Sequence, residues 1–445
     1  MQWSTIAAVS FGFYMHGLTF YFVIASLAGV HSATLTAAYQ SLTIGIPFLL
    51  NLVDSDGRKR MLRFGAIELL YLLFAALFLY DYFTTRTPEI FPENLIIYAG
   101  LYWFALMVGR SLSFEQLKTV CYTSNRVAVA TSLLLIAQVV TGTASWADHG
   151  RRLVAGTAGN PINVGHTGAY AFLTCLLLWL KAKPSSKMVW LGLSVPGLMV
   201  TIFSGTRSAT LAILLGAAIV AIYVTRIITQ SGRSVARVTT NVTFIFGLLL
   251  SVMLLLGPLM AAPGQSAGTK TAEPSPLTVA IDNGSKRIDA LFQVLSGGNT
   301  GDSSIRGREN MFRFAFEGFL AHPLSGQGLY SQYATHNAFL QVALEFGILG
   351  VTTFVAPFFY IVYHIVQATF LTAKRVRQAS SQINPERFIR SDFSVVTCFM
   401  LVIFMQAVCL FSFHGDPYRN YLPICSTGLL LAYLRSQRAA FRKSI

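Results

Sequence analysis

Long apolar runs constrain this chain more than any other feature of its sequence. About twelve of them have the length that a helix needs to cross a bilayer. They lie near residues 4–25, 35–53, 62–82, 94–110, 127–142, 164–180, 188–203, 208–225, 241–261, 337–370, 393–413 and 419–434. Only 11% of the 445 residues are charged, whereas a soluble domain carries about a quarter. Because the runs do not alternate as barrel strands do, the sequence predicts an all-α integral membrane protein.

The positions of lysine and arginine predict how the spans are oriented. If the N-terminus lies in the cytoplasm, 22 of the 33 lysines and arginines fall on the cytoplasmic side, in every loop and in the tail. This bias predicts that both termini are cytoplasmic. The net charge of +15 is then explained by membrane topology, and no nucleic-acid partner is expected. Since no Lys or Arg precedes Arg58, we expect no cleavable signal peptide.

One long polar region divides the chain into three parts. Residues 1–262 hold the first nine predicted spans, residues 263–335 form an outward-facing loop with amphipathic helices, and residues 336–445 hold the last three spans and the tail. The run 337–370 is long for one crossing, which predicts a tilt, a kink or an interfacial turn before it. The five cysteines lie in or beside apolar runs and are interpreted as packing residues.

Arg207 is the first of three outward-facing features. It follows Ser204-Gly205-Thr206, and either hydroxyl residue can cap the helix that begins there. A cation in the first turn opposes the helix dipole at a cost of about 0.3–1 kcal/mol. An anion bound between the guanidinium and the free N–H groups would remove this cost. The alternative is an arginine that extends to lipid headgroups.

The second feature is an amphipathic segment in the polar loop. Arg308 is predicted to open a helix on the membrane surface, with Arg306 beside it and an apolar face behind it. That face consists of Met311, Phe312, Ala315, Phe316 and Phe319. A solvated basic helix end is the alternative. The stretch "HPLSGQG" that follows is expected to be a turn, with a structural His322.

The third feature is His336, at the head of an apolar run. We expect it in the first turn of a helix, where the dipole keeps the imidazole neutral and able to accept a proton. A capping or interfacial histidine is the alternative. Taken together, the three features predict a basic, metal-free pocket with one candidate base, suited to a diphosphate headgroup. The Asp54-Ser55-Asp56 triplet lies on the other side by charge count, and no nucleotide-binding motif is present.

These residues resemble the O-antigen ligase superfamily, which also contains O-antigen polymerases and protein O-oligosaccharyltransferases. One family pattern is an arginine, three residues and a leucine, and another is a histidine, an amide and two spaced glycines. The first pattern matches Arg207 and Leu211, and the second matches His336, Asn337, Gly347 and Gly350. The helix after Arg308 and "HPLSGQG" are similar to a further family element, and 152–163 resembles a looser one, with Asn160-Pro161 in reversed order.

The resemblance implies a membrane-embedded, GT-C-like glycosyltransferase that is inverting and needs no metal or other cofactor. The donor would be O-antigen on undecaprenyl diphosphate, the acceptor a lipid A–core sugar, and the site periplasmic in a bacterial inner membrane. His336, Arg207 and Arg308 would be catalytic. Arg306, Arg152, Asn337 and Tyr330 would bind the diphosphate or the acceptor. Lys286 and Arg287 compete with Arg308 and Arg306 for the loop-arginine position.

Three other functions stay open at this point. An O-antigen polymerase would extend a lipid-linked chain, and a protein oligosaccharyltransferase would modify serines. A secondary transporter is a more distant alternative, because "DSDGRKRML" after Val53 is similar to a loop motif of major facilitator proteins. The glycine expected four residues before Asp54 is Leu50, and no second copy of the motif appears.

Overall fold

The computed structural model describes residues 3–30, 32–85, 102–147, 152–156, 159–230, 303–329, 335–378, 385–414 and 421–444. Its helices up to the polar region are α1 (Trp3–Leu27), α2 (Ala33–Val53), α3 (Ser55–Leu62), α4 (Ala66–Thr85), α6 (Tyr102–Ser111), α7 (Phe114–Val140), α8 (Pro161–Lys181), α9 (Pro184–Phe203) and α10 (Arg207–Gln230). The later ones are α13 (Ser303–Ala321), α14 (Ala338–Gly350), a π-helical turn (Val351–Val355), α15 (Ala356–Gln378), α16 (Pro385–Ile389), α17 (Asp392–Phe413) and α18 (Tyr421–Ser444).

The chain is a helical multi-pass membrane protein. Nine helical stretches in the described residues are long and apolar enough to span: α1, α2, α4, α7, α8, α9, α10, the stretch Ala338–Val376 and α17. Of the twelve predicted runs, 241–261 lies outside the described residues, and only the end of 94–110 is described, as α6. The last predicted span corresponds to α18, which is not among the nine.

The boundaries of two helices differ from the sequence prediction because of local hydrogen bonds. The predicted span 127–142 belongs to α7, which begins at Phe114. There Ser113 and Gln116 form a capping box that starts the helix earlier. The segment "DSDGRKRML" contains the short helix α3, and the Asp54 carboxylate caps it by accepting a hydrogen bond from Gly57 N at 2.8 Å.

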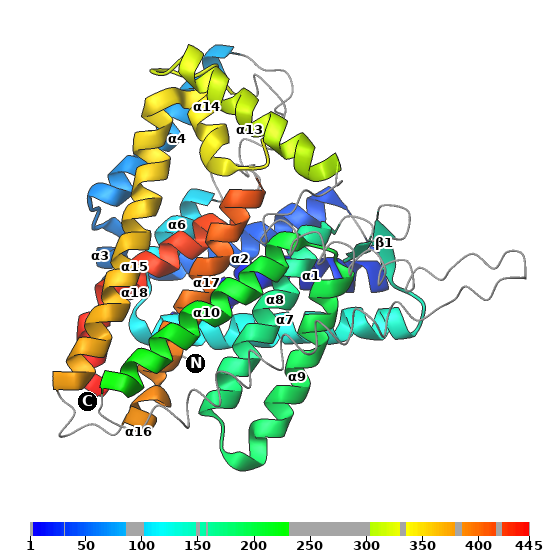
Figure 1. Cartoon of the computed structure of the whole chain (residues 1–445), viewed down its shortest axis with the longest axis vertical. Helices are drawn as coiled ribbons and strands as arrows, with labels where there is room; N and C mark the ends of the chain where they lie inside the picture. The colour runs from blue at the N-terminus through cyan, green and yellow to red at the C-terminus, as the bar shows by residue number, and fades with distance from the viewer. Residues whose placement is uncertain are drawn as a thin grey trace, which may run out of the picture.

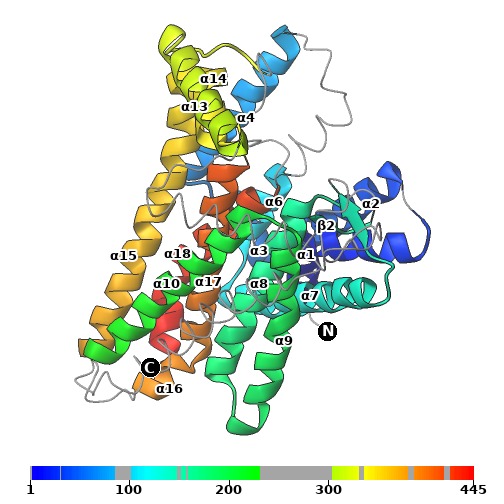
Figure 2. The same ribbon diagram turned by 45° about the vertical axis from the view of Figure 1, so that its right-hand side comes forward.

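Helices α8 and α17 lie at the centre of the bundle and are buried along most of their length, whereas only a small part of α2 and α4 is buried. Figures 1 and 2 show α10 and α18 running beside α17, and α13 lying across the end of the bundle near α14 and the end of α4. All five cysteines are free and buried, as the packing interpretation predicted.

Glycines set the closest contact between neighbouring helices. A Cβ atom on Gly168 of α8 would lie 2.6 Å from the Gly197 carbonyl oxygen of α9, and one on Gly197 would lie 2.7 Å from the Gly168 oxygen. Since lipid tails are as apolar as leucine, membrane helices associate through close packing of small residues. The α8–α9 hairpin therefore depends on both glycines.

The prediction of an all-α fold was incomplete in one place. A short antiparallel hairpin pairs β1 (Ser145–Ala147) with β2 (Arg152–Val154), between α7 and α8. The segment is too polar and too short to cross the bilayer. Pairing the two strands gives hydrogen-bond partners to backbone N–H and C=O groups that an irregular loop would leave without them.

Candidate functional site

Arg207 is the first residue of α10, as the sequence predicted. The Thr206 carbonyl oxygen accepts from Ala209 N at 3.1 Å and from Thr210 N at 3.2 Å, which fixes the start of the helix. The Thr206 hydroxyl, however, donates to the Pro161 carbonyl oxygen at 3.0 Å. The turn before α10 is thereby attached to the start of α8, where Asn160 caps the helix.

Arg152 braces the same turn from β2. Its Nε donates to the Ser204 carbonyl oxygen at 2.9 Å and its Nη2 to the Thr206 hydroxyl at 3.2 Å. Gly165 makes room for the turn, since a Cβ there would lie 2.4 Å from Ser204 Oγ. The structure thus brings Arg152 and Arg207 together, and it gives Arg152 a positioning role that sequence reasoning did not predict.

His336 is not in the first turn of a helix, so that prediction was wrong. Helix α14 begins at Ala338, and Asn337 is its N-cap, with its side chain accepting from Leu340 N at 3.0 Å. The structure thus gives Asn337 a capping role in α14. His336 lies just before the cap and is exposed. The cap residue has a non-helical conformation, and it therefore directs the preceding chain away from the helix axis.

The backbone of His336 is strained. Its φ of 56° makes it the one non-glycine residue with positive φ in the described part of the chain. For an L-residue this conformation costs about 1–2 kcal/mol. Neighbouring hydrogen bonds hold it there: the Thr335 hydroxyl donates to the Asn337 carbonyl oxygen at 2.8 Å, and Thr335 N donates to Gln341 Oε1 at 2.8 Å. Such strain is concentrated at functional sites.

The C-terminal turn of α17 connects the two segments that carry Arg207 and His336. Asn337 Nδ2 donates to the Ser412 carbonyl oxygen at 3.3 Å, and the Ser208 hydroxyl lies 3.2 Å from His414 Nε2. One turn of α17 therefore contacts the residue after Arg207 and the residue after His336. Residues 129 positions apart in the sequence are assembled at the same end of the bundle by this turn.

Sequence reasoning missed a hydrogen-bonded chain at this end. The Ser208 hydroxyl lies 3.0 Å from His166 Nε2 of α8 as well as 3.2 Å from His414 Nε2 of α17. His166 is fully buried, and its carbonyl oxygen accepts from Gln406 Nε2 at 2.8 Å. Both histidines lie at the predicted outer ends of apolar runs, and this position is the sequence feature that could have marked them as candidate site residues. Their connection through Ser208 depends on how three helices pack.

The glycines in the motif segments allow backbone conformations and contacts that other residues would prevent. Gly347 has a φ of 59° and breaks α14 there, which confirms that the run 337–370 is kinked. Opposite the kink, Gln327 N donates to the Leu344 carbonyl oxygen at 2.8 Å, and Ile348 N donates to the Pro323 carbonyl oxygen at 2.7 Å. "HPLSGQG" is the predicted turn, and its backbone lies directly against the kink.

A side chain at either of two glycines would prevent this contact. A Cβ on Gly347 would lie 2.6 Å from Leu324 backbone atoms, and one on Gly326 would lie 2.2 Å from Glu345 backbone atoms. The glycine of the His336 pattern and the turn "HPLSGQG" therefore form the two sides of one backbone interface, which holds α13 against α14.

The predicted loop residues are less completely placed. Helix α13 begins at Ser303 and not at Arg308, because the five residues before Arg308 continue the helix. Arg306 and Arg308 lie within α13, with side chains outside the described part, and Tyr330 lies outside the described residues, as do Lys286 and Arg287. On the predicted apolar face, Ala315 is buried, whereas Phe316 is 53% exposed.

One family model covers both segments of this candidate site. Residues 192–355 match the model described as O-antigen ligase, and the match extends from α9 through Arg207 and His336 to the π-helical turn. No curated protein matches the chain. The family comprises membrane enzymes that transfer glycans. Residues 192–355 of this chain are accordingly a domain of the O-antigen ligase family.

Proposed function

We propose that this protein is an O-antigen ligase. It transfers a glycan from undecaprenyl diphosphate to a hydroxyl group of a lipid A–core sugar, on the periplasmic side of the inner membrane. The observation that carries the proposal is the turn of α17 that connects the starts of α10 and α14 through Ser208–His414 and Asn337–Ser412. The family match and the charge bias of the loops support it.

His336 acts as the general base. The acceptor oxygen attacks the anomeric carbon, the bond from that carbon to the diphosphate oxygen breaks, and the hydroxyl proton passes to the imidazole. The configuration at the anomeric carbon inverts because attack and departure take place on opposite faces. The exposure of His336 and its strained backbone, which Thr335 and Asn337 hold in place, support this role.

Arginines stabilise the leaving diphosphate in place of a metal ion. Arg207 stands at the N-terminus of α10, where free N–H groups and the helix dipole also favour an anion. Arg152 holds the turn and adds its own charge nearby. Arg308, with Arg306 as the second choice, contributes from α13. Asn337 positions His336 through its cap. Tyr330, which lies outside the described residues, is assigned to acceptor binding on the family resemblance alone.

Reconstitution tests this function directly. Purified protein is mixed with lipid-linked glycan and with lipid A–core, with a longer lipid-linked chain or with a pilin-like protein as acceptor. We expect transfer to lipid A–core, and we expect EDTA to leave its rate unchanged. Transfer to another acceptor alone would identify a polymerase or a protein oligosaccharyltransferase instead. Inhibition by EDTA that Mg²⁺ reverses would refute the metal-independent mechanism.

A pair of histidine variants tests the base. His336→Ala should lower the transfer rate about 10²–10⁴-fold, the usual contribution of a general base. His322→Ala is the matched control, because His322 is exposed in the turn that packs against α14 and should keep nearly full activity. Near-normal turnover of His336→Ala would reject the assignment.

A further inference from the structure

A large cavity lies at the other end of the bundle. It has a volume of about 1050 Å³ and is bounded by α3 and the segment that joins it to α4, the end of α6, the middle of α18, and the starts of α7 and α17. Asp392 at the start of α17 lines it, whereas Ser412 and His414 at the end of α17 contact the candidate site. A 22-residue helix is about 33 Å long, so the two places are separated by roughly the thickness of a bilayer core.

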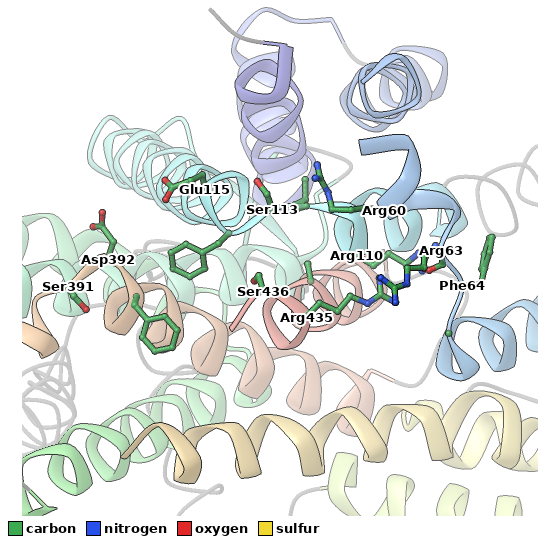
Figure 3. Close-up of a pocket in the computed structure, with 15 residues that line it drawn as sticks. Arg60, Arg63, Phe64, Arg110, Ser113, Glu115, Ser391, Asp392, Arg435 and Ser436 are labelled. Atoms are coloured by element: carbon green, nitrogen blue, oxygen red, sulfur yellow. The ribbon is translucent and has the colours of Figure 1, made fainter. Parts of the chain in front are cut away.

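One side of this cavity has more guanidinium groups than carboxylates. Figure 3 shows Arg63, Arg110 and Arg435 together there, with Phe64 beside them. Glu68 forms ion pairs with both Arg110, at 3.0 Å, and Arg435. Burial, and after it repulsion from Arg63, lower the pKa of Arg435. Arg110 and Arg435 thus share one carboxylate while Arg63 adds a further positive charge, and an added anion would relieve the repulsion.

The carboxylates on the opposite side of the cavity are neutralised. Asp392 pairs with Lys118 at 2.6 Å and with Lys181, and Glu115 lies 3.6 Å from Lys118. Figure 3 shows Asp392 and Glu115 away from the arginine group. The negative charges that line the cavity therefore have lysine partners of their own and do not cancel the charge of the arginines.

An apolar groove continues from the arginine side. A second cavity of about 670 Å³ lies between α4, α15 and α18, and it shares Gly65 and Arg435 with the first. Most of its lining is apolar and includes Ile67, Leu70, Pro357, Leu371, Leu431 and Leu434. A cationic headgroup pocket that opens into an apolar groove between spans has the shape and chemistry of a phospholipid.

We propose that this double cavity binds one anionic phospholipid, with its phosphoryl headgroup at Arg63 and Arg435 and an acyl chain along the groove between α4, α15 and α18. Basic pockets between membrane helices bind acidic headgroups in this way. The charge count assigns this end to the cytoplasm, so the lipid comes from the inner leaflet. The site is separate from the one proposed for glycan transfer and does not depend on that function.

Native mass spectrometry of the full chain tests the proposal. The protein in detergent is titrated with phosphatidylglycerol or with phosphatidylcholine of the same acyl chains, so that only the headgroup differs. We expect the wild type to retain phosphatidylglycerol more strongly. Arg63→Ala should weaken this retention about five-fold, the value of one cation near an acidic headgroup. Equal retention of the two lipids by the wild type would overturn the proposal.

Matched variants test whether lipid retention depends on the positive charge of Arg63 in particular. Arg58→Ala removes the same charge from an exposed residue of α3 outside both cavities and should leave phosphatidylglycerol retention unchanged. Arg63→Lys should keep most of it. Arg63→Ala should fold, because Arg63 is exposed and its carbonyl, which accepts from Arg110, remains. Equal losses in Arg63→Ala and Arg58→Ala would overturn the proposal.

Inorganic phosphate distinguishes a lipid from a free anion. Because the apolar groove contributes to binding, millimolar phosphate should displace little phosphatidylglycerol. Complete displacement by phosphate would show that the arginine group takes a free anion, and would refute the lipid assignment.

Discussion

The two ends of α17 hold their arginines in opposite ways. At the end where α17 begins, Arg110 is paired with the buried carboxylate of Glu68, and their side chains are 0% and 3% exposed. Near His414, the hydrogen bonds of Arg152 to Ser204 and Thr206 go to neutral oxygens. The Glu68 carboxylate neutralises charge and fixes the fold at the first end, whereas the two bonds of Arg152 at the second end hold its guanidinium against the turn before α10. The second arrangement suits a site for an anionic substrate.

The largest predicted effect is a loss of stability when the ion pair between Glu68 and Arg110 is removed. Glu68→Gln keeps the side-chain shape but leaves the buried guanidinium of Arg110 without its carboxylate, which should lower the free energy of unfolding by about 3–5 kcal/mol. Thermal unfolding in detergent measures the change. Glu115→Gln is the control, because that carboxylate is 79% exposed and its ion pair should contribute less than about 1 kcal/mol. Equal shifts in both variants would contradict the comparison.

At the other end, a lost arginine should affect the reaction and not the fold. Arg207→Ala should slow transfer about 10²–10³-fold, the usual cost of losing one group that stabilises developing charge, with an unchanged unfolding midpoint. Arg313→Ala removes the same charge from an exposed part of α13 and should leave turnover unchanged. If Arg207→Ala lowered stability as much as Glu68→Gln, the two ends would not differ as proposed.

The chain through Ser208 should have a smaller effect. Ser208→Ala removes hydrogen bonds to His166 and His414, which loosens the start of α10, and we expect turnover to fall about ten-fold, the equivalent of one or two hydrogen bonds. Steady-state kinetics measures the change. Thr210→Val removes a hydroxyl group from the same helix that bonds the backbone at 3.4 Å, and it should act nearly as wild type. Similar losses in both variants would rule out a special role for Ser208.

The smallest effect concerns the strain at His336. Glycine adopts a φ of 56° without steric cost but is more flexible in the unfolded chain. His336→Gly should therefore be about 1 kcal/mol more stable than His336→Ala, while both lose transfer activity. Unfolding of the two variants side by side measures the difference. A less stable glycine variant would show that residue 336 is not held in this conformation.

Much of the candidate site could be predicted from the sequence because short motifs carry it. Arg207 at a helix start, the turn at "HPLSGQG" and the break in the run 337–370 all follow from local residue preferences. The position of His336 was predicted incorrectly, because Asn337 is the cap and the helix starts only at Ala338. The bracing role of Arg152 was missed, since its partners lie more than 50 residues away.

By itself, the sequence determined that this chain spans a membrane many times, because apolar runs of that length have no other stable environment. It also determined which residues carry ionisable chemistry at which helix ends. Only the tertiary structure decided that the end of α17 contacts the starts of both α10 and α14, that Ser208 connects two histidines, and that Arg110 and Arg435 share Glu68. These contacts join distant segments, and their formation depends on how side chains pack between helices, which no local pattern encodes.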